Sequence, residues 1–143
     1  MAEPTPITPD AVRELMLRQD TFSRLLGLEV AEVRLGYCRL TMAVRPDLLN
    51  GYGSLHGGAT FAAADTAFAL ACNSHGRVSV GLSVTIDYLE AGRLGDVLTV
   101  EAQEVSLKHK ASVYQVQVRN QAGVVLALFK GTAYRTSQLV LQP

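Results

Sequence analysis

One stretch of the sequence, residues 50–73, limits the folds open to this chain more than any other. It begins with the glycine-rich turn NGYGSLHGG and continues as a run of small and apolar residues in which Asp65 is the single charge. A helix that is polar on no face is buried inside a fold. We therefore expect residues 57–74 to form an internal helix, with the Asp65 carboxylate placed where a charge is costly.

The overall composition fits one domain with a single core. The chain has 143 residues, with thirteen basic and thirteen acidic side chains and a formal net charge of zero. We expect one domain over residues 1–143, with a loose proline-rich arm at 1–8 and a tail at 137–143. The longest basic run is Lys108-His109-Lys110, so the charge pattern does not favour nucleic acid as a partner.

The cysteines and the N-terminal residues indicate the cellular compartment of the protein. Cys38 and Cys72 lie in apolar surroundings without CxxC spacing, so we expect reduced core residues and no metal site. The first ten residues contain three prolines and no apolar stretch of a signal peptide. The helical run is too short to span a bilayer. These features predict a soluble cytoplasmic protein without a membrane segment.

Hydrophobic periodicity predicts the elements before the internal helix. Residues 9–26 carry apolar side chains near helical spacing, with a break near Asp20-Thr21. Residues 30–35 and 38–44 are predicted to form a hairpin, because the second run alternates apolar and polar side chains.

Strands are predicted after the helix. Three long runs cover residues 78–88, 97–107 and 124–135, and Tyr114, Val116 and Val118 mark a further strand. Successive strands joined by turns imply an antiparallel sheet, and one buried helix implies that this sheet curls around it, in an α+β fold. The absence of βαβ alternation, of GxGxxG and of a P-loop excludes a nucleotide-binding Rossmann fold.

The start of the internal helix is a candidate site for negative charge. His56-Gly57-Gly58 lies where the glycine-rich turn enters the helix, and the free N–H groups and dipole of a first turn stabilise an anion. The Gly57 N–H is thus a candidate oxyanion donor. The alternative is that the glycines only permit a tight turn.

Asp65 cannot reach that site within the same chain. It lies nine residues after His56, which is about 13 Å of axial rise along a helix. Cooperation therefore requires two chains whose helices pack antiparallel about a two-fold axis. In that arrangement Asp65 can attack an acyl carbonyl or deprotonate a water that does so. The alternative is a structural Asp65 bonded to a backbone amide or an arginine.

Two polar residues of the turn are further candidates. Asn50 has donor and acceptor ends that can orient the water or the carbonyl, and His56 can fix the loop or polarise a thioester. A structural role in the loop is the alternative for both.

These residues together carry a family resemblance. The run Asn50-x5-His56-Gly57-Gly58 followed by Asp65 resembles the signature of the hot-dog fold thioesterases of the phenylacetate-degradation (PaaI) type, within the 4-hydroxybenzoyl-CoA thioesterase superfamily. The resemblance makes Asp65 the nucleophile or general base and Gly57 the oxyanion donor. Asn50 and His56 become the residues that position thioester and water.

The resemblance covers about residues 22–136 and implies a fold, an assembly and an activity. The fold is the hot-dog fold, an antiparallel sheet wrapped around one long central helix. The assembly is a homodimer with a continuous sheet as the minimal active unit, often paired into a homotetramer. The activity is hydrolysis of acyl-CoA without metal or cofactor, since coenzyme A is part of the substrate.

The resemblance also suggests substrate contacts. A hydroxyl on the strand after the helix is assigned to Ser83, with Ser79 and Thr85 as competitors. Tyr88 lies in a segment, Asp-Tyr-Leu, that is similar to one in the family. The triplet Lys108-His109-Lys110 falls where such proteins contact the CoA phosphates, and a solvated turn is its alternative explanation.

The leading hypothesis is an acyl-CoA thioesterase acting on (hydroxy)phenylacetyl-CoA or a similar aryl or medium-chain acyl-CoA. Its acyl group would lie in a pocket lined by Phe61, Phe68, Leu48 and Tyr52. One alternative is a hot-dog hydratase, but those resemble a different arrangement with the Asp before the His. The other is an acyl-CoA-binding or regulatory module, which needs no carboxylate opposite an oxyanion donor.

Overall fold

The structure is a computed structural model that describes residues 7–140. Of the arm expected at residues 1–8, only the last two residues belong to this part, and Thr8 caps the first helix. The expected tail at 137–143 begins too early, because strand β6 (Val125–Leu139) includes residues 137–139. The last three residues of the chain lie outside the described part.

Two short helices precede the sheet, α1 (Pro9–Arg18) and α2 (Thr21–Leu26), and the break expected between them is confirmed. The Thr8 hydroxyl and the Asp20 carboxylate each accept a first-turn N–H and cap these helices. Gly27 ends α2 with a φ of 72°, in the left-handed region that glycine adopts most easily.

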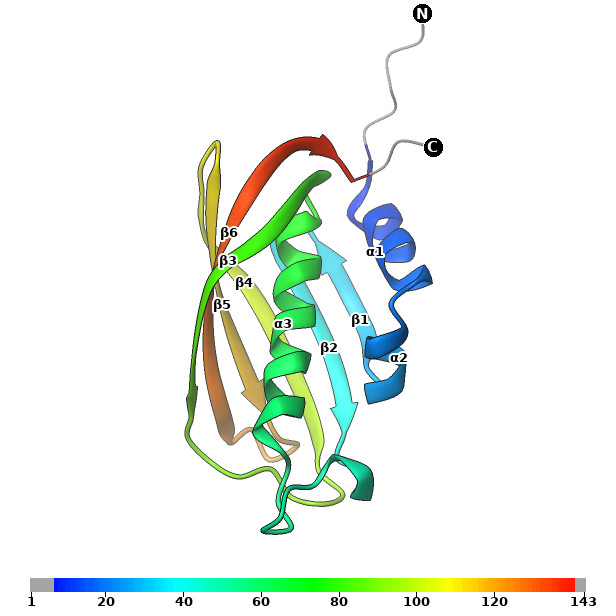
Figure 1. The fold of residues 1–143 in the computed structure, drawn as a ribbon, viewed down its shortest axis with the longest axis vertical. Helices are drawn as coiled ribbons and strands as arrows, with labels where there is room; N and C mark the ends of the chain where they lie inside the picture. The colour runs from blue at the N-terminus through cyan, green and yellow to red at the C-terminus, as the bar shows by residue number, and fades with distance from the viewer. Residues whose placement is uncertain (1–6, 141–143) are drawn as a thin grey trace, which may run out of the picture.

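Six antiparallel strands form one sheet in the order β1-β2-β4-β5-β6-β3. The strands other than β6 are β1 (Glu29–Arg34), β2 (Tyr37–Ala43), β3 (Arg77–Tyr88), β4 (Val97–Leu107) and β5 (Ala111–Arg119). The predicted hairpin and the predicted later strands are confirmed. However, β3 does not pair with β4, which follows it in sequence, but crosses to the far edge of the sheet and pairs with β6 (Figure 1).

Helix α3 (Gly57–Asn73) lies in the concave side of this curved sheet and connects β2 to β3, after the short 3-10 helix η1 (Pro46–Leu48) (Figure 1). It packs against β2, β3, β4 and β5. Half of its buried residues are alanines, which let the helix approach the strands closely. The predicted α+β fold, a sheet wrapped around one long helix, is confirmed.

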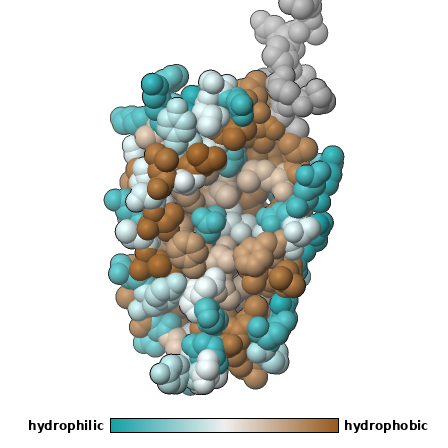
Figure 2. Space-filling model, in the orientation of Figure 1, coloured by the Kyte–Doolittle hydropathy of each residue, from teal (hydrophilic) through white to brown (hydrophobic). Residues whose placement is uncertain are grey.

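The sheet covers only one side of α3. Phe61 keeps 36% of its surface exposed, and Asp65 is also exposed. The prediction of a helix buried on every side is therefore wrong for the single chain, because the six strands do not close around it. On the side of the molecule where α3 faces the viewer, apolar and polar residues are interspersed (Figure 2).

The centre of the core is an aromatic cluster under α3. The Phe68 ring lies 5.7 Å from the rings of both Tyr114 and Phe129. Gly131 on β6 leaves room for Phe68, since a Cβ at that position would lie 2.7 Å from the ring. The Phe68 ring therefore packs in the space that the absent side chain of Gly131 leaves on the sheet.

Both cysteines belong to the core. Cys38 and Cys72 are buried and free, as predicted, and burial raises the pKa of each thiol to about 12. No helix within residues 7–140 is long and apolar enough to cross a bilayer.

One side chain ties the end of α3 to the start of β3. The Asn73 amide donates to the carbonyls of Ala69 (2.9 Å) and Ser79 (3.1 Å), and its Oδ1 accepts the Ser79 N–H (2.9 Å). A single buried amide thus satisfies backbone groups of a helix and of a strand. It fixes the point at which β3 leaves the helix.

Candidate active site

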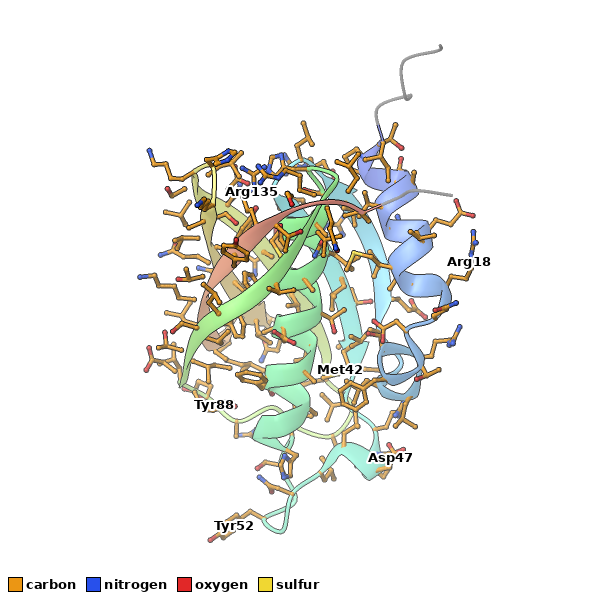
Figure 3. The ribbon with its side chains drawn as sticks, turned by 45° about the horizontal axis from the view of Figure 1, so that its top comes forward. Arg18, Met42, Asp47, Tyr52, Tyr88 and Arg135 are labelled. Atoms are coloured by element: carbon orange, nitrogen blue, oxygen red, sulfur yellow. The ribbon has the colours of Figure 1, made fainter. Side chains whose placement is uncertain are left out.

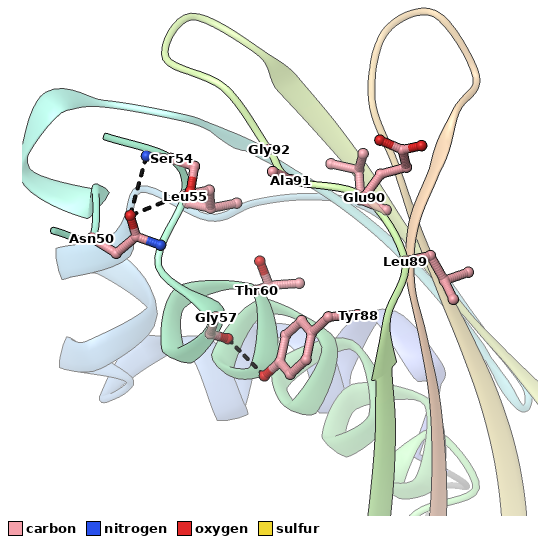
Figure 4. Close-up of a pocket in the computed structure, with 11 residues that line it drawn as sticks. Asn50, Ser54, Leu55, Gly57, Thr60, Tyr88, Leu89, Glu90, Ala91 and Gly92 are labelled. Carbon is pink, nitrogen blue, oxygen red and sulfur yellow. Dashed lines mark hydrogen bonds between the residues drawn. The ribbon is translucent and has the colours of Figure 1, made fainter. Parts of the chain in front are cut away.

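The turn before α3 is held together by Asn50. Its Oδ1 accepts hydrogen bonds from the Tyr52 N–H (2.9 Å), the Ser54 N–H (3.2 Å) and the Ser54 hydroxyl (3.3 Å). Figure 4 shows the two bonds from Ser54. The Asn50 Nδ2 has no acceptor among residues 7–140 and points away from these bonds. The acceptor end therefore has the structural role, and the donor end remains available to a ligand.

His56 caps α3. Its Nδ1 accepts the Gly58 N–H at 2.8 Å, and its own N–H donates to the Leu48 carbonyl at 2.8 Å. The Nδ1 atom is therefore unprotonated in this bond, and the His56 ring fixes the loop. Since the Gly58 N–H is occupied, the Gly57 N–H is the first-turn donor that has no acceptor within the described chain.

A pocket of about 310 Å³ opens beside Gly57 (Figure 4). Its wall combines the turn, the first turn of α3, the last residue of β3, the chain after β3 and one residue of β6. The lining residues are Asn50, Ser54, Leu55, Gly57, Thr60, Tyr88, Leu89, Glu90, Ala91, Gly92 and Leu126. Three predicted site residues, Asn50, Gly57 and Tyr88, are thus brought together. The Tyr88 hydroxyl donates to the Gly57 carbonyl at 3.0 Å.

Asp65 does not line this pocket. It lies two turns further along the open side of α3, and its carboxylate forms no hydrogen bond or ion pair with any residue from 7 to 140. Partial burial raises the pKa of its carboxyl above the usual aspartate range. The structural alternative, an Asp65 bonded to an amide or an arginine, finds no partner in this part of the chain.

The competing hydroxyls of β3 also lie outside the pocket. Ser79 is buried, and its hydroxyl donates to the Arg77 carbonyl at 3.1 Å. Ser83 and Thr85 are exposed on the edge strand, where Ser83 lies opposite Thr132 of β6. Only Ser83 and Thr85 therefore have a surface that a ligand or a second chain can reach.

The basic triplet Lys108-His109-Lys110 forms the exposed turn between β4 and β5. In Figure 1 this hairpin lies at one end of the molecule, and the start of α3 with Gly57 lies at the other. One chain does not bring the triplet to the pocket. No group of three or more metal-binding side chains occurs within residues 7–140.

None of the four residues predicted for the acyl pocket lines the pocket beside Gly57. Phe68 and Leu48 belong to the core, and Tyr52 is 98% exposed at the tip of the loop, where it projects from the molecule (Figure 3). Phe61 lies on the open side of α3 and contacts Phe129 edge to face at 5.6 Å. Apolar character alone does not distinguish a core residue from a pocket residue.

Several pocket residues were missed. Thr60 lies three residues after Gly57, so the helical period could have placed it on the same side. Glu90 and Leu126 gave no local signal, because their position depends on the pairing of β3 with β6.

A sheet wrapped around one helix, with a pocket at the N-terminus of that helix, defines a class of protein. The family model described as "Thioesterase superfamily" matches residues 52–127. The chain belongs to this superfamily, and the expectation of a hot-dog fold thioester hydrolase is confirmed.

Individual relatives narrow this class to the PaaI group. The chain is 40% identical to acyl-coenzyme A thioesterase PaaI of Escherichia coli K12, over 84% of this chain and 86% of that protein. It is 39% identical to a putative esterase of Archaeoglobus fulgidus, over 90% and 84% of the two chains.

Solved structures give the same grouping. The structure of E. coli PaaI, from the phenylacetic acid degradation operon, superposes with a TM-score of 0.90 at 37% identity, covering 92% of this chain and 95% of that one. A hypothetical thioesterase of Streptococcus pneumoniae, solved with coenzyme A, superposes with a TM-score of 0.75 at 34% identity, covering 78% and 90%.

Proposed function

We propose that this protein is an acyl-CoA thioesterase whose oxyanion donor is the Gly57 N–H. The observation that carries the proposal is a first-turn N–H without an acceptor in the described chain, beside a pocket of about 310 Å³. The positive end of the helix dipole and a fixed N–H stabilise the oxygen on which charge develops during acyl transfer. The names of the relatives, which include acyl-CoA thioesterases, support the same substrate class.

The pocket supplies a second donor for the thioester. The Asn50 Nδ2 lies on the pocket wall, while its Oδ1 is held by three hydrogen bonds. This fixed amide can orient the thioester carbonyl or the attacking water without reorganisation during the reaction. His56 contributes by holding the helix start, and its second ring nitrogen has no hydrogen-bond partner among residues 7–140.

Asp65 of a second copy completes the site. Within one chain Asp65 lies outside the pocket, so a homodimer with antiparallel α3 helices is the smallest active unit. Its carboxylate either attacks the carbonyl carbon or takes a proton from a water that attacks it. In the first route the C–S bond breaks as a mixed anhydride with Asp65 forms, and a water then hydrolyses this anhydride. In the second route the water adds to the carbonyl directly and the C–S bond breaks. In both routes coenzyme A leaves as the thiol, with a proton that comes from the water, and the acyl group leaves as the acid.

The lining of the pocket favours an aryl or medium-chain acyl group. Leu55, Leu89, Leu126 and the Tyr88 ring provide apolar contacts. Phenylacetyl and hydroxyphenylacetyl are the acyl groups we propose, in keeping with the operon from which the E. coli relative comes. The mechanism requires no metal or cofactor.

The remaining features of the proposal concern assembly and location. Two dimers pair into a homotetramer, and Lys108-His109-Lys110 contacts the CoA phosphates of a neighbouring subunit's site. The relative solved with coenzyme A supports such a ligand. The two buried free cysteines support a cytoplasmic location.

The decisive experiment measures thiol release from a panel of CoA esters. Gly57→Pro removes the N–H, and proline suits this first helical position because His56, at φ −62° and ψ 131°, already has the extended backbone that precedes proline. Gly57→Ala is the matched control, since it adds the same Cβ but keeps the N–H. We expect kcat to be about 100-fold lower for the proline variant than for the alanine variant.

Each alternative gives a different result in this assay. Equal kcat values for the two variants, with the fold intact by circular dichroism, would remove the oxyanion role of Gly57. Binding of CoA esters without thiol release by the wild type would indicate the non-catalytic module. Hydration of an enoyl-CoA without thiol release would indicate the hydratase.

A further inference from the structure

We propose that the Tyr88 hydroxyl is a positioning group, which acts by fixing the peptide unit between Gly57 and Gly58 and not by hydrogen-bonding the substrate. The inference rests on the proposed function, in which the adjacent Gly57 N–H stabilises the oxyanion. It gives the hydroxyl a different role from the substrate contact that the family resemblance suggested for Tyr88.

Both ends of one peptide unit are hydrogen-bonded at the start of α3. The Gly57 carbonyl accepts the Tyr88 hydroxyl at 3.0 Å (Figure 4). The Gly58 N–H donates to His56 Nδ1 at 2.8 Å. Because the peptide unit is planar, bonds at its two ends fix its orientation about the chain. This orientation sets ψ of Gly57 and thereby the direction in which the Gly57 N–H points relative to the helix.

These two hydrogen bonds restrain the part of α3 whose backbone has the greatest conformational freedom. Two successive glycines open α3, and glycine restricts its own backbone less than any other residue. The Tyr88 ring lies against Gly57, since a Cβ at Gly57 would be 3.3 Å from it. The ring and the hydroxyl of Tyr88 thus provide the restriction that a side chain at position 57 would otherwise give.

Tyr88 connects the sheet to the start of α3. It is the last residue of β3 and pairs with Ala127 of β6. Its hydroxyl proton is committed to the Gly57 carbonyl, although its side chain is half exposed and lines the pocket. The Gly57 N–H needs such a restraint, because a donor stabilises an oxyanion only when it points at the oxygen.

The test compares Tyr88→Phe with Tyr134→Phe. The first variant removes the hydroxyl that bonds Gly57, and the second removes a hydroxyl on β6 that has no partner among residues 7–140. We expect Tyr88→Phe to lower kcat about tenfold and to change KM less than twofold. Tyr134→Phe should leave both constants unchanged. An increase in KM with kcat unchanged would overturn the proposal, because it would place the hydroxyl on the substrate.

A double variant separates positioning from direct catalysis. If Tyr88 acts only through the Gly57 N–H, adding Tyr88→Phe to Gly57→Pro should lower kcat no further. A second tenfold loss in the double variant would overturn the proposal.

An NMR measurement tests whether Tyr88 fixes this peptide unit without relying on an activity assay. The amide resonances of Gly57 and Gly58 should shift or broaden in Tyr88→Phe and stay in place in Tyr134→Phe. Unchanged glycine resonances would overturn the positioning role. If the wild type releases no thiol from any CoA ester, the proposed function fails, and the NMR result still decides whether Tyr88 fixes this peptide unit.

Discussion

Asp65 has an environment that suits a base better than a structural charge. It is exposed on the open side of α3, it has no bonded partner within the described chain, and partial burial raises the pKa of its carboxyl. A raised pKa means that the carboxylate is a stronger base than that of an ordinary aspartate.

This environment predicts the pH dependence of activity. The ionised form is required for attack or proton transfer, so kcat/KM should rise with pH through the raised pKa of Asp65, above the usual value near 4. Asp65→Asn should lower kcat about 100-fold or more. A pH–rate profile of kcat/KM from pH 3.5 to 8 checks the first point, and retention of most of the activity in Asp65→Asn would contradict the assigned role.

The stability of the same variant is an independent control. A raised carboxyl pKa in the folded state stabilises the fold below the unfolded pKa, and this contribution is lost as pH rises through the folded pKa. Asp65→Asn avoids that loss, so its Tm should exceed the wild-type Tm by about 2 °C at pH 7 and equal it at pH 3.5. Differential scanning calorimetry at the two pH values measures the difference.

At the scale of elements, the contact between α3 and β6 depends on one glycine. Phe68 fits between Tyr114 and Phe129 because Gly131 has no side chain. The fit leaves no free space, so an added methyl group must displace a buried ring or bend a strand.

Gly131→Ala should therefore destabilise the protein by about 1 to 3 kcal/mol. The control is Gly51→Ala, where a Cβ would meet no atom within 4 Å. Urea unfolding should give a lower midpoint for Gly131→Ala and an unchanged midpoint for Gly51→Ala. A wild-type midpoint for Gly131→Ala would show that the cluster can relax around the methyl group.

The elements were predictable from sequence, but their pairing was not. The alternation in residues 78–88 reports the two faces of a strand, which is a local property. The choice of β6 as the partner of β3 depends on contacts between distant parts of the chain. The same limit explains the acyl pocket, because Phe68 in the core and Leu126 in the pocket are equally apolar in sequence.

Among the site residues, the predictable ones were those set by local chain geometry. A glycine-rich turn entering a helix placed His56 as a cap and Gly57 at the first turn. The nine-residue separation of His56 and Asp65 kept Asp65 out of the pocket. The exposure of Asp65 was not predictable, since a sequence with an apolar helix does not show how far the sheet closes around it.

At the scale of the whole molecule, the two edges of the sheet differ. Edge strand β1 has three charged residues among six, which discourages pairing with another chain. Edge strand β3 has two among twelve and exposes Val80 (48%) and Leu82 (66%). Edge β3 is therefore the one suited to pair with a second copy, on the same side as the open face of α3.

Shared sites predict complementation between two inactive variants. In the proposed dimer a site takes Gly57 from one chain and Asp65 from the other, so random assembly of Gly57→Pro with Asp65→Asn would leave about one quarter of the sites intact. Co-expression should restore about one quarter of the wild-type kcat, whereas each variant alone is nearly inactive. If Gly57 and Asp65 worked within one chain, co-expression would restore nothing.

The buried amide of Asn73 has a consequence that extends beyond its own chain. It bonds Ala69 in α3 and Ser79 in β3, so it sets how the edge strand is aligned along the helix that carries Gly57 and Asp65. In a dimer joined through β3, the register between two chains would translate directly into the distance between one Gly57 and the other Asp65. The Asn73 side chain would then help to set the distance between Gly57 of one chain and Asp65 of the other, although it belongs to neither residue's site.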